Sequence, residues 1–348
     1  MSALFIGGCA AKVLKFEKQD HQKAEKEFEQ VVKIEMPAAA EPTGVPSENA
    51  SVAQSKKSEK DQKPSSAVKD KKSKTAKVVK SKVPEKTDKS TEKQVLRRQP
   101  EIESDIGFDG RRPLVDPFRV GEKVTHRVHY FKVTAGQLSF EVKPFVVVNG
   151  RKAYNFRTSI VTSSLFSSFY TADDFSETLV DYENLTPSVF TLHVQESAQI
   201  KEAKSFFDFE KRKAIYWENK ITEKNGKEEK RQEWELEEYS QNVFSAAYYM
   251  RNFQWKVGEE NLFRVSDDGE NITFRGKAIR KETLETEVGT FEAIVVKPEF
   301  ELKGVFKPVG DIYIWLSNDD RKYILKIESK IKIGTLVSEI IELAPGKP

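Results

Sequence analysis

Aromatic side chains are confined almost entirely to the last 248 residues of this 348-residue chain. Of its 37 Phe, Tyr and Trp residues, 34 follow position 100, and positions 51 to 100 contain none. Because a hydrophobic core needs large apolar side chains, the first hundred residues cannot build one. We therefore expect a folded body over residues 111–345, with structure beginning near Arg112 and Pro113, and its length suits one large domain or two small ones.

Charge separates the same regions. The net charge is −2 over residues 1–50, +10 over 51–100 and −5 over the remainder, which sums to the +3 of the whole chain. Residues 36–110 are rich in Lys, Ser, Pro and Thr, a composition typical of a disordered linker. Lysines can bind nucleic acid through counterion release, but here aromatic stacking partners are lacking and only Arg97 and Arg98 offer guanidinium groups. We expect a solvated spacer that binds no nucleic acid, with weak attraction to an anionic envelope polymer or lipid headgroups as the alternative.

Residues 12–35 form a charged stretch with a thin apolar stripe at Ala24, Phe28, Val31 and Val32. This spacing predicts a short, marginal helix. We favour a solvated helix over one that forms a coiled coil with a partner.

The only cysteine, Cys9, directly follows Ile6, Gly7 and Gly8. This run resembles the lipobox of bacterial lipoproteins, which implies acylation of Cys9, a membrane anchor and residues 1–11 as the remnant of a lipoprotein signal. Ala10 is not the aspartate that resembles an inner-membrane retention signal, which favours the periplasmic side of the outer membrane. No basic residue precedes Cys9 and the apolar run is shorter than a secretory signal needs, so either the start lies upstream or Cys9 is an ordinary cytoplasmic thiol.

A single cysteine also excludes an internal disulfide framework and a thiolate zinc cluster. No stretch of the chain approaches the roughly 20 apolar residues of a membrane-spanning helix.

Strict alternation of apolar and polar residues dominates the body. It is clearest from Tyr323 to Ile333, where one face carries Tyr, Leu and Ile while the other carries Lys322, Lys326 and Lys330. Such alternation predicts antiparallel strands with one packed and one wet face. The pairs at 149–150, 225–226 and 268–269 are Asn-Gly or Asp-Gly, which favour tight hairpin turns. We expect about a dozen strands in a large curled antiparallel sheet or half-open β-barrel.

Two segments depart from alternation. Residues 242–251 have helical spacing and an Asn242 that can cap a helix, so they predict one short helix against the concave side of the sheet. Residues 164–170 predict a second short helix or an apolar loop over the mouth of the sheet.

Four runs resemble, in order, landmarks of the bacterial exported family catalogued as domain of unknown function 3108: Gly121–Gly136, Phe244–Arg251, Gly289–Ala293 and Trp315–Arg321. The resemblance implies an envelope protein with a half-open barrel and no established activity. Asn318 and Tyr323 stand where the family often has aspartate and proline, and both touch a turn. The final strands also resemble carriers that move lipoproteins through the periplasm, which is an analogy of fold alone.

The sequence offers little support for a catalytic function. His126 and His129 fall on opposite faces of a strand and cannot share a metal ion, so we interpret them as partly exposed sheet histidines. The acid pairs at 173–174, 267–268 and 319–320 are typical of turns. The serines at 163–168 lack a hydrolase elbow, and no nucleotide-binding motif appears. We expect no enzyme, no cofactor and no metal.

Three functions remain as hypotheses. The favoured one is a carrier or binding module whose aromatic residues hold an apolar or amphipathic envelope ligand, such as a lipid. Its candidate residues are Phe166, Phe169, Tyr170, Phe244, Tyr248, Tyr249, Trp255, Tyr313 and Trp315, although the same side chains could simply form the core. The alternatives are a structural or assembly lipoprotein that contacts another envelope protein, and a hydrolase of envelope glycans.

Overall fold

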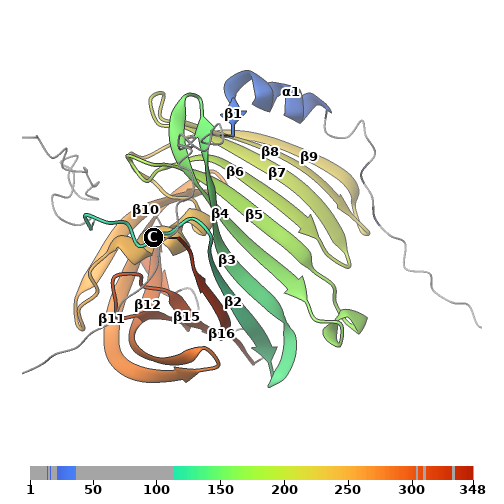
Figure 1. The fold of residues 1–348 in the computed structure, drawn as a ribbon. Coiled ribbons are helices and arrows are strands. Elements are labelled where there is room, and N and C mark those ends of the chain that lie inside the picture. Colours follow the sequence, from blue (N-terminus) through green and yellow to red (C-terminus); the bar gives the residue numbers. More distant parts are fainter. Residues whose placement is uncertain are drawn as a thin grey trace, which may run out of the picture. The chain divides into compact units, whose positions relative to one another are not determined.

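A single antiparallel sheet makes up most of the body (Figure 1). The computed structural model describes residues 14, 16, 22–36, 113–302, 305–308, 311–330 and 334–347. Residues 1–11 with Cys9, and the Lys-rich segment except for its first residue, lie outside this described part, as does Arg112. Within it the sheet has sixteen strands, more than the dozen expected.

Fourteen strands form one hydrogen-bonded path that does not close on itself. In spatial order they are β10 (Glu260–Asp267), β11 (Glu270–Thr286), β12 (Gly289–Leu302), β14 (Ile312–Ser317), β15 (Ile324–Lys330), β16 (Thr335–Pro345), β2 (Glu122–Tyr130), β3 (Val133–Val148), β4 (Arg151–Thr162), β5 (Asp173–Asp181), β6 (Pro187–Gln195), β7 (Gln199–Asp208), β8 (Lys213–Thr222) and β9 (Gly226–Glu235). Two further strands lie off the path: β1 (Ile34–Glu35) pairs with β3, and β13 (Val305–Pro308) pairs with β12.

The two terminal strands of the path approach each other without forming a ladder. Trp234 on β9 donates its indole N–H to the Ser266 hydroxyl on β10 over 2.8 Å, and Lys230 pairs with Asp268. A lone bridge joins Gln241 to Val265. The curled sheet is therefore a half-open barrel, as predicted.

The predicted turns are present. Asn149 and Gly150 both have positive φ angles, 48° and 80°, between β3 and β4, and Asp268 and Gly269 repeat this between β10 and β11. Gly226, at φ 71°, begins β9 after the β8–β9 turn. Local turn chemistry thus sets these hairpins.

β15 departs from the predicted alternation at its beginning. The register shifts between β14 and β15, so that Ile324 and Leu325 are both buried, and the strand begins only at Ile324. Lys322 is 8% exposed and donates to the backbone carbonyl of Asp319. The prediction that Lys322 lies on the solvent-exposed face is therefore wrong. A bulge adds a residue that simple alternation cannot anticipate.

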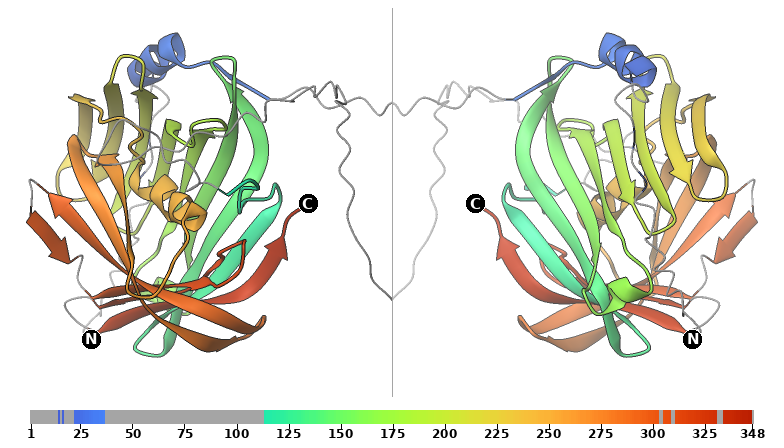
Figure 2. Two further views of the ribbon diagram at one scale, coloured as in Figure 1. Left: turned by 90° about the vertical axis from the view of Figure 1, so that its left-hand side faces the viewer. Right: turned by 90° about the vertical axis from the view of Figure 1, so that its right-hand side faces the viewer.

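Helix α2 (Val243–Tyr249) fills part of the concave side of the sheet (Figure 2). Asn242 caps it through a capping box with Ser245, and the short 3₁₀ helix η2 (Met250–Asn252) follows. The Tyr248 ring stacks on Phe156 at 4.2 Å, and its hydroxyl donates to the Arg157 carbonyl over 2.7 Å. We call this filled region the plug. The space between Phe118, Phe156 and Tyr249 has no room for a water molecule.

Helix α1 (Gln22–Val31) packs on the convex face of the sheet and is not solvated on its apolar side. Phe28 is 5% exposed and meets the Trp217 ring edge-on at 5.9 Å. Glu27 accepts from the Trp217 indole and from Arg231, each over 2.9 Å. The expectation that this apolar stripe is solvated is therefore wrong, because a ring from β8, far along the sequence, covers the stripe. Residues 22–36 belong to the body, because β1 also pairs with β3.

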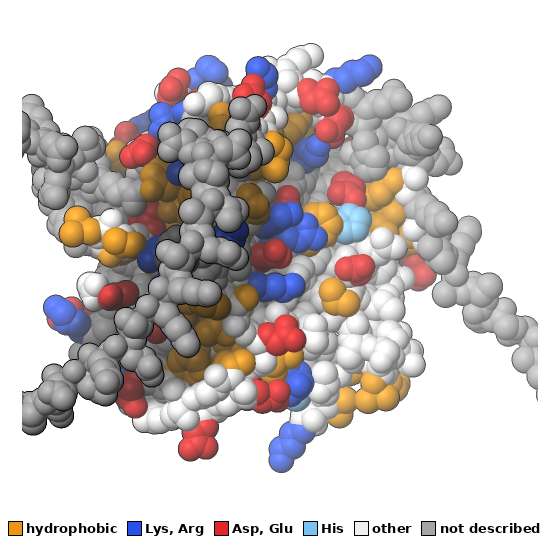
Figure 3. Space-filling view, viewed as in Figure 1, with side chains coloured by type: hydrophobic (Ala, Val, Ile, Leu, Met, Phe, Trp, Pro, Cys, Tyr) orange, Lys and Arg blue, Asp and Glu red, His pale blue; other side chains and the backbone are white. Residues whose placement is uncertain are grey.

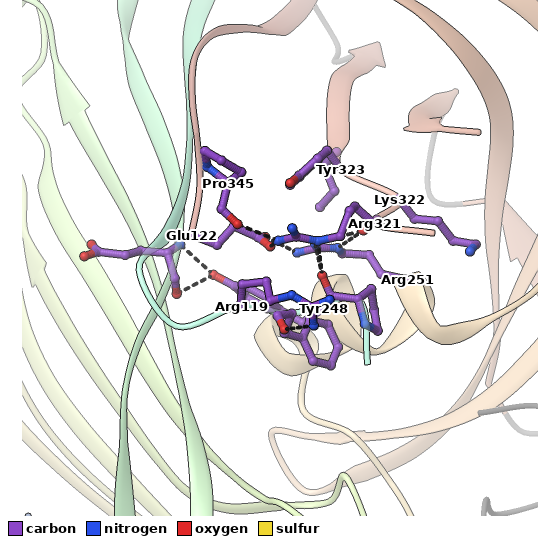
Figure 4. A network of polar contacts seen from close by, with 12 residues as sticks. Arg119, Glu122, Tyr248, Arg251, Arg321, Lys322, Tyr323 and Pro345 are labelled. Carbon is purple, nitrogen blue, oxygen red and sulfur yellow. Dashed lines mark hydrogen bonds and ion pairs between the residues drawn. The ribbon is translucent and has the colours of Figure 1, made fainter. Parts of the chain in front are cut away.

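A buried ionic network links the segment at the start of β2 to the end of β16 (Figure 4). Arg251, 2% exposed, donates to the Glu122 carboxylate over 2.7 Å and to the backbone carbonyl of Arg321. Arg321 in turn donates to Glu122, Pro117 and Pro345. These contacts hold the segment before β2, the end of β16 and the plug together. Since the buried charges are paired and hydrogen-bonded, we interpret the network as structural.

Candidate functional site

The concave face is hollow at the end of β2, β3 and β4 opposite to α1. A row of cross-strand neighbours crosses five strands here, from Ile327 through Ser338, Val128 and Gly136 to Thr162. Neighbours in register share a face, so all five side-chain positions face the interior.

A cavity of about 450 Å³ lies over this row. Its walls come from β2, β3, β4, β15, β16 and the segment between β4 and β5: Val128, Ala135, Gly136, Leu138, Ile160, Val161, Thr162, Phe166, Tyr170, Ala172, Ile327, Ser329, Leu336 and Ser338. We call this cavity the apolar pocket. Its only side-chain polar atoms are four hydroxyls, those of Thr162, Tyr170, Ser329 and Ser338, and its volume is within the range of small-molecule sites.

Small residues create the space. A Cβ at Gly136 would lie 2.3 Å from the Val161 carbonyl oxygen, so no side chain fits there without backbone movement. Ser329, Ser338 and Ala172 occupy wall positions where Leu or Phe would fill the volume. In the plug, by contrast, β3 and β4 carry Phe140 and Phe156.

The segment after β4 covers one side of the apolar pocket. Ser163 bonds its backbone N–H to the Ala135 carbonyl and its hydroxyl to the Thr134 carbonyl, which fixes this segment on β3. The 3₁₀ helix η1 (Phe166–Ser168) follows and brings Phe166 and Tyr170 to the pocket wall. Burial and a hydrogen bond to Glu196 raise the pKa of Tyr170, so its hydroxyl stays neutral.

A buried histidine and a serine form the polar part of the boundary between pocket and plug. His126 is fully buried, and its Nδ1 lies 2.7 Å from the Ser338 hydroxyl while its Nε2 lies 2.8 Å from the Ile324 carbonyl oxygen. The carbonyl can only accept, so a neutral ring donates from Nε2 and accepts the Ser338 proton at Nδ1. The interpretation of His126 as partly exposed is therefore wrong. Its ring also contacts Phe140, which contacts Tyr248.

This pair resembles a nucleophile and base only in its geometry. Burial lowers the pKa of His126 to about 4. A general base works best with a pKa near the working pH, so this imidazole is a poor proton acceptor near neutrality. We interpret the pair as a fixed hydrogen bond that satisfies two buried polar groups.

The structure distributes the predicted aromatic residues over four environments. Phe166 and Tyr170 line the apolar pocket, and Phe169, 84% exposed, lies outside it. Four belong to the filled interior: Tyr248, Tyr249 and Trp255 are buried in the plug, and Phe244 stacks on Phe190.

Tyr313 and Trp315 lie on the convex face. Trp315 pairs in register with Lys326, whereas its neighbour Ile314 pairs with the pocket residue Ile327. Lys326 and Arg280 lie over the Trp315 ring, and Glu282 accepts its indole N–H. Neither residue lines the pocket.

The inward-facing residues of β2, β3, β15 and β16 were not singled out from the sequence. A usable signal was present: Ser329 and Ser338 interrupt otherwise apolar faces, and Gly136 stands inside a strand. Small residues in register on neighbouring strands indicate a hollow, but recognising it requires the strand order.

The described residues also bear on metal binding, on the acids predicted in turns and on membrane-spanning helices. No group of three or more His, Cys, Asp or Glu side chains could hold a metal ion there. Asp319 accepts the backbone N–H groups of Arg321 and Lys322, which is the expected role of an acid in a turn. None of the described helices is long and apolar enough to cross a bilayer.

The fold and the pocket define a class: an open antiparallel β-barrel with a helical plug and an apolar cavity beside it. The chain belongs to the family described as Protein of unknown function (DUF3108), which matches residues 125–341. The sequence resemblance to that family is thereby confirmed. No curated protein matches the chain.

Three solved structures are similar to it. A β-barrel-like protein with domain of unknown function DUF1849 from Brucella abortus has 9% identity and a TM-score of 0.40, covering 65% of this chain and 98% of its own. A candidate exported protein with a YmcC-like fold from Bacteroides fragilis has 9% identity and a TM-score of 0.30, covering 66% and 98%. A candidate lipoprotein from Parabacteroides distasonis has 12% identity and a TM-score of 0.27, covering 67% and 98%.

Proposed function

We propose that this protein is a non-enzymatic binding or carrier protein of the bacterial envelope whose apolar pocket holds the hydrocarbon part of an amphipathic ligand. The observation that carries the proposal is the cavity of about 450 Å³ with walls that are almost wholly apolar. Burying a hydrocarbon chain there would remove both chain and walls from water, which is favourable in proportion to the apolar area.

The polar atoms of the pocket suit a chain better than a headgroup. The Ser338 hydroxyl already donates to His126, and the other three belong to Thr162, Ser329 and Tyr170. A charged headgroup inside would lack partners for its hydrogen bonds, which is costly. The headgroup therefore stays at the mouth of the pocket, where water reaches it.

The test is a pair of matched substitutions. Val128→Phe places a ring in the cavity, and Val337→Phe places the same ring on the convex face, since Val337 pairs with His129 and Glu328. Both purified chains and the wild type are titrated with a fluorescent long-chain fatty acid, and native mass spectrometry records co-purified lipid. Val128→Phe should weaken binding about tenfold or more, while Val337→Phe should not. Equal binding by all three chains would refute the pocket as the site.

We also propose that Cys9 is acylated and holds the protein on the periplasmic side of the envelope, with the outer membrane favoured. The support is the run Ile6-Gly7-Gly8-Cys9. Mass spectrometry of the protein from its native membrane tests this: the expected amino terminus is an acylated Cys9. An unmodified thiol on a cytoplasmic chain would refute it.

A further inference from the structure

Large apolar side chains are exposed around the mouth of the apolar pocket. Phe131 and Val133, in the β2–β3 turn and at the start of β3, are 62% and 44% exposed. In the segment between β4 and β5, Leu165, Phe169 and Tyr170 are 71%, 84% and 40% exposed. We call these five residues the apolar tip.

Exposed large apolar side chains are concentrated at the apolar tip and scattered over the other described residues. Fourteen large apolar side chains are exposed among the described residues, and five of them lie in these two neighbouring segments. In Figure 3 hydrophobic side chains gather at the lower right of the surface, at the end of the sheet where β4 and β5 meet. A concentration of this kind marks an interaction site.

The tip is continuous with the pocket. Tyr170 belongs to both, and Phe166 on the pocket wall lies 6.1 Å from the Phe169 ring. Phe131 contacts the Tyr130 ring and covers Gly334, just before the pocket residue Leu336. A hydrocarbon chain that leaves the pocket therefore meets apolar side chains before it meets bulk water.

Acidic groups outnumber basic ones beside the tip. Lys132 lies inside one segment, whereas Asp173 and Asp174 follow the other and Glu196 interacts with Tyr170. Attraction to an anionic lipid surface requires a cluster of basic residues, which the described residues beside the tip lack. Insertion of aromatic and aliphatic side chains into a neutral interface requires none.

We propose that the apolar tip inserts into the interface of a zwitterionic lipid bilayer, so that the pocket exchanges its ligand with the lipid surface. The exchange rests on the proposed function, whereas the insertion can be measured by itself. Leu165 and Phe169 are the most exposed of the five side chains and enter the interface first.

The test is flotation with phosphatidylcholine vesicles, using the full chain with Cys9→Ser so that no acyl group contributes. Adding Leu165→Ser and Phe169→Ser should reduce the vesicle-bound fraction about tenfold or more. The matched control carries Leu114→Ser and Val257→Ser, which are 90% and 52% exposed away from the tip, and it should float like its parent. Phe169→Trp, in the same chain, should shift its emission to the blue when vesicles are added.

Three results would overturn the insertion: a parent chain that stays off the vesicles, a tip variant that floats as well as the parent, or binding that requires anionic lipid and disappears in high salt. The fatty-acid titration separates this proposal from the proposed function. A tip variant that binds the soluble fatty acid but not vesicles supports both proposals. A parent that floats but does not bind the fatty acid refutes the pocket and leaves the insertion standing.

Discussion

The concave face of one sheet contains a filled half and a hollow half, built on the same strands. Around the plug, β3 and β4 carry Phe140, Tyr154 and Phe156, and α2 packs its aromatic side chains against them. Toward the other end of the same strands stand Gly136 and Thr162, and β16 adds Ser338. Because β3 and β4 line both halves, the difference shows that side-chain size along each strand decides which part of the interior is hollow.

The largest expected effect lies in the plug. Tyr248→Ala removes a fully buried ring and its hydrogen bond to the Arg157 carbonyl, so the free energy of unfolding should fall by about 3–5 kcal/mol. Urea unfolding measures this, and Tyr248→Phe isolates the hydroxyl with a loss of about 1–3 kcal/mol. If Tyr248→Ala instead abolished ligand binding at unchanged stability, the division into a filled and a hollow half would be wrong.

The boundary between the halves should respond to pH. His126 has a pKa of about 4 in the folded protein, against 6.5 when exposed in the unfolded chain. Above pH 6.5 both states are neutral and stability is unaffected. As the pH falls from 6.5 to 4, the unfolded chain binds a proton at His126 that the folded protein does not. The free energy of unfolding therefore falls by about 1.4 kcal/mol per pH unit.

The total loss from this residue is about 3 kcal/mol, and below pH 4 it adds no further slope. Urea unfolding across this range should give a shallower slope for His126→Gln than for the wild type. Identical slopes would show that His126 is not buried as a neutral group.

A matched pair of substitutions compares the halves directly. Ala172 on the pocket wall and Ala246 in the plug are each 8% exposed. Ala246→Leu should cost about 1–3 kcal/mol through overpacking, whereas Ala172→Leu extends into empty volume and should change stability by less than about 1 kcal/mol. Thermal unfolding of both variants decides this, and equal costs would contradict the hollow.

The smallest effect on global stability is expected on the convex face, where the chain covers an apolar surface with its own helix. Phe28→Ala should release α1, because a ten-residue helix is marginal without packing. Hydrogen exchange should then increase over residues 22–31 while the strands of the barrel keep their protection. Lys26→Ala, an exposed change on the same helix, is the control.

Features with local causes could be predicted from the sequence. The cap of α2 needs only Asn242 and Ser245, and the β3–β4 hairpin needs only Asn149 and Gly150. The face of the sheet on which a side chain lies was harder to predict from the sequence, because a one-residue bulge reverses every side chain beyond it. The prediction of Trp315 on the concave face rested on its aromatic side chain alone, and the structure places it on the convex face.

Contacts between distant segments were not predictable. Trp217 covers Phe28 across nearly two hundred residues, and the hollow depends on five strands drawn from both ends of the body. No pattern within a single segment records either arrangement.

The docking of residues 22–36 alters the reach of the proposed lipid anchor. Since α1 and β1 are fixed on the barrel, the Lys-rich segment is joined to the body at both ends, through Met36 and Pro113. Twelve residues lie between Cys9 and Gln22, so the proposed anchor is at most about 45 Å from the start of α1. Removing residues 40–110 would leave this upper limit unchanged, whereas each residue removed between Cys9 and Gln22 would lower it by about 3.5 Å.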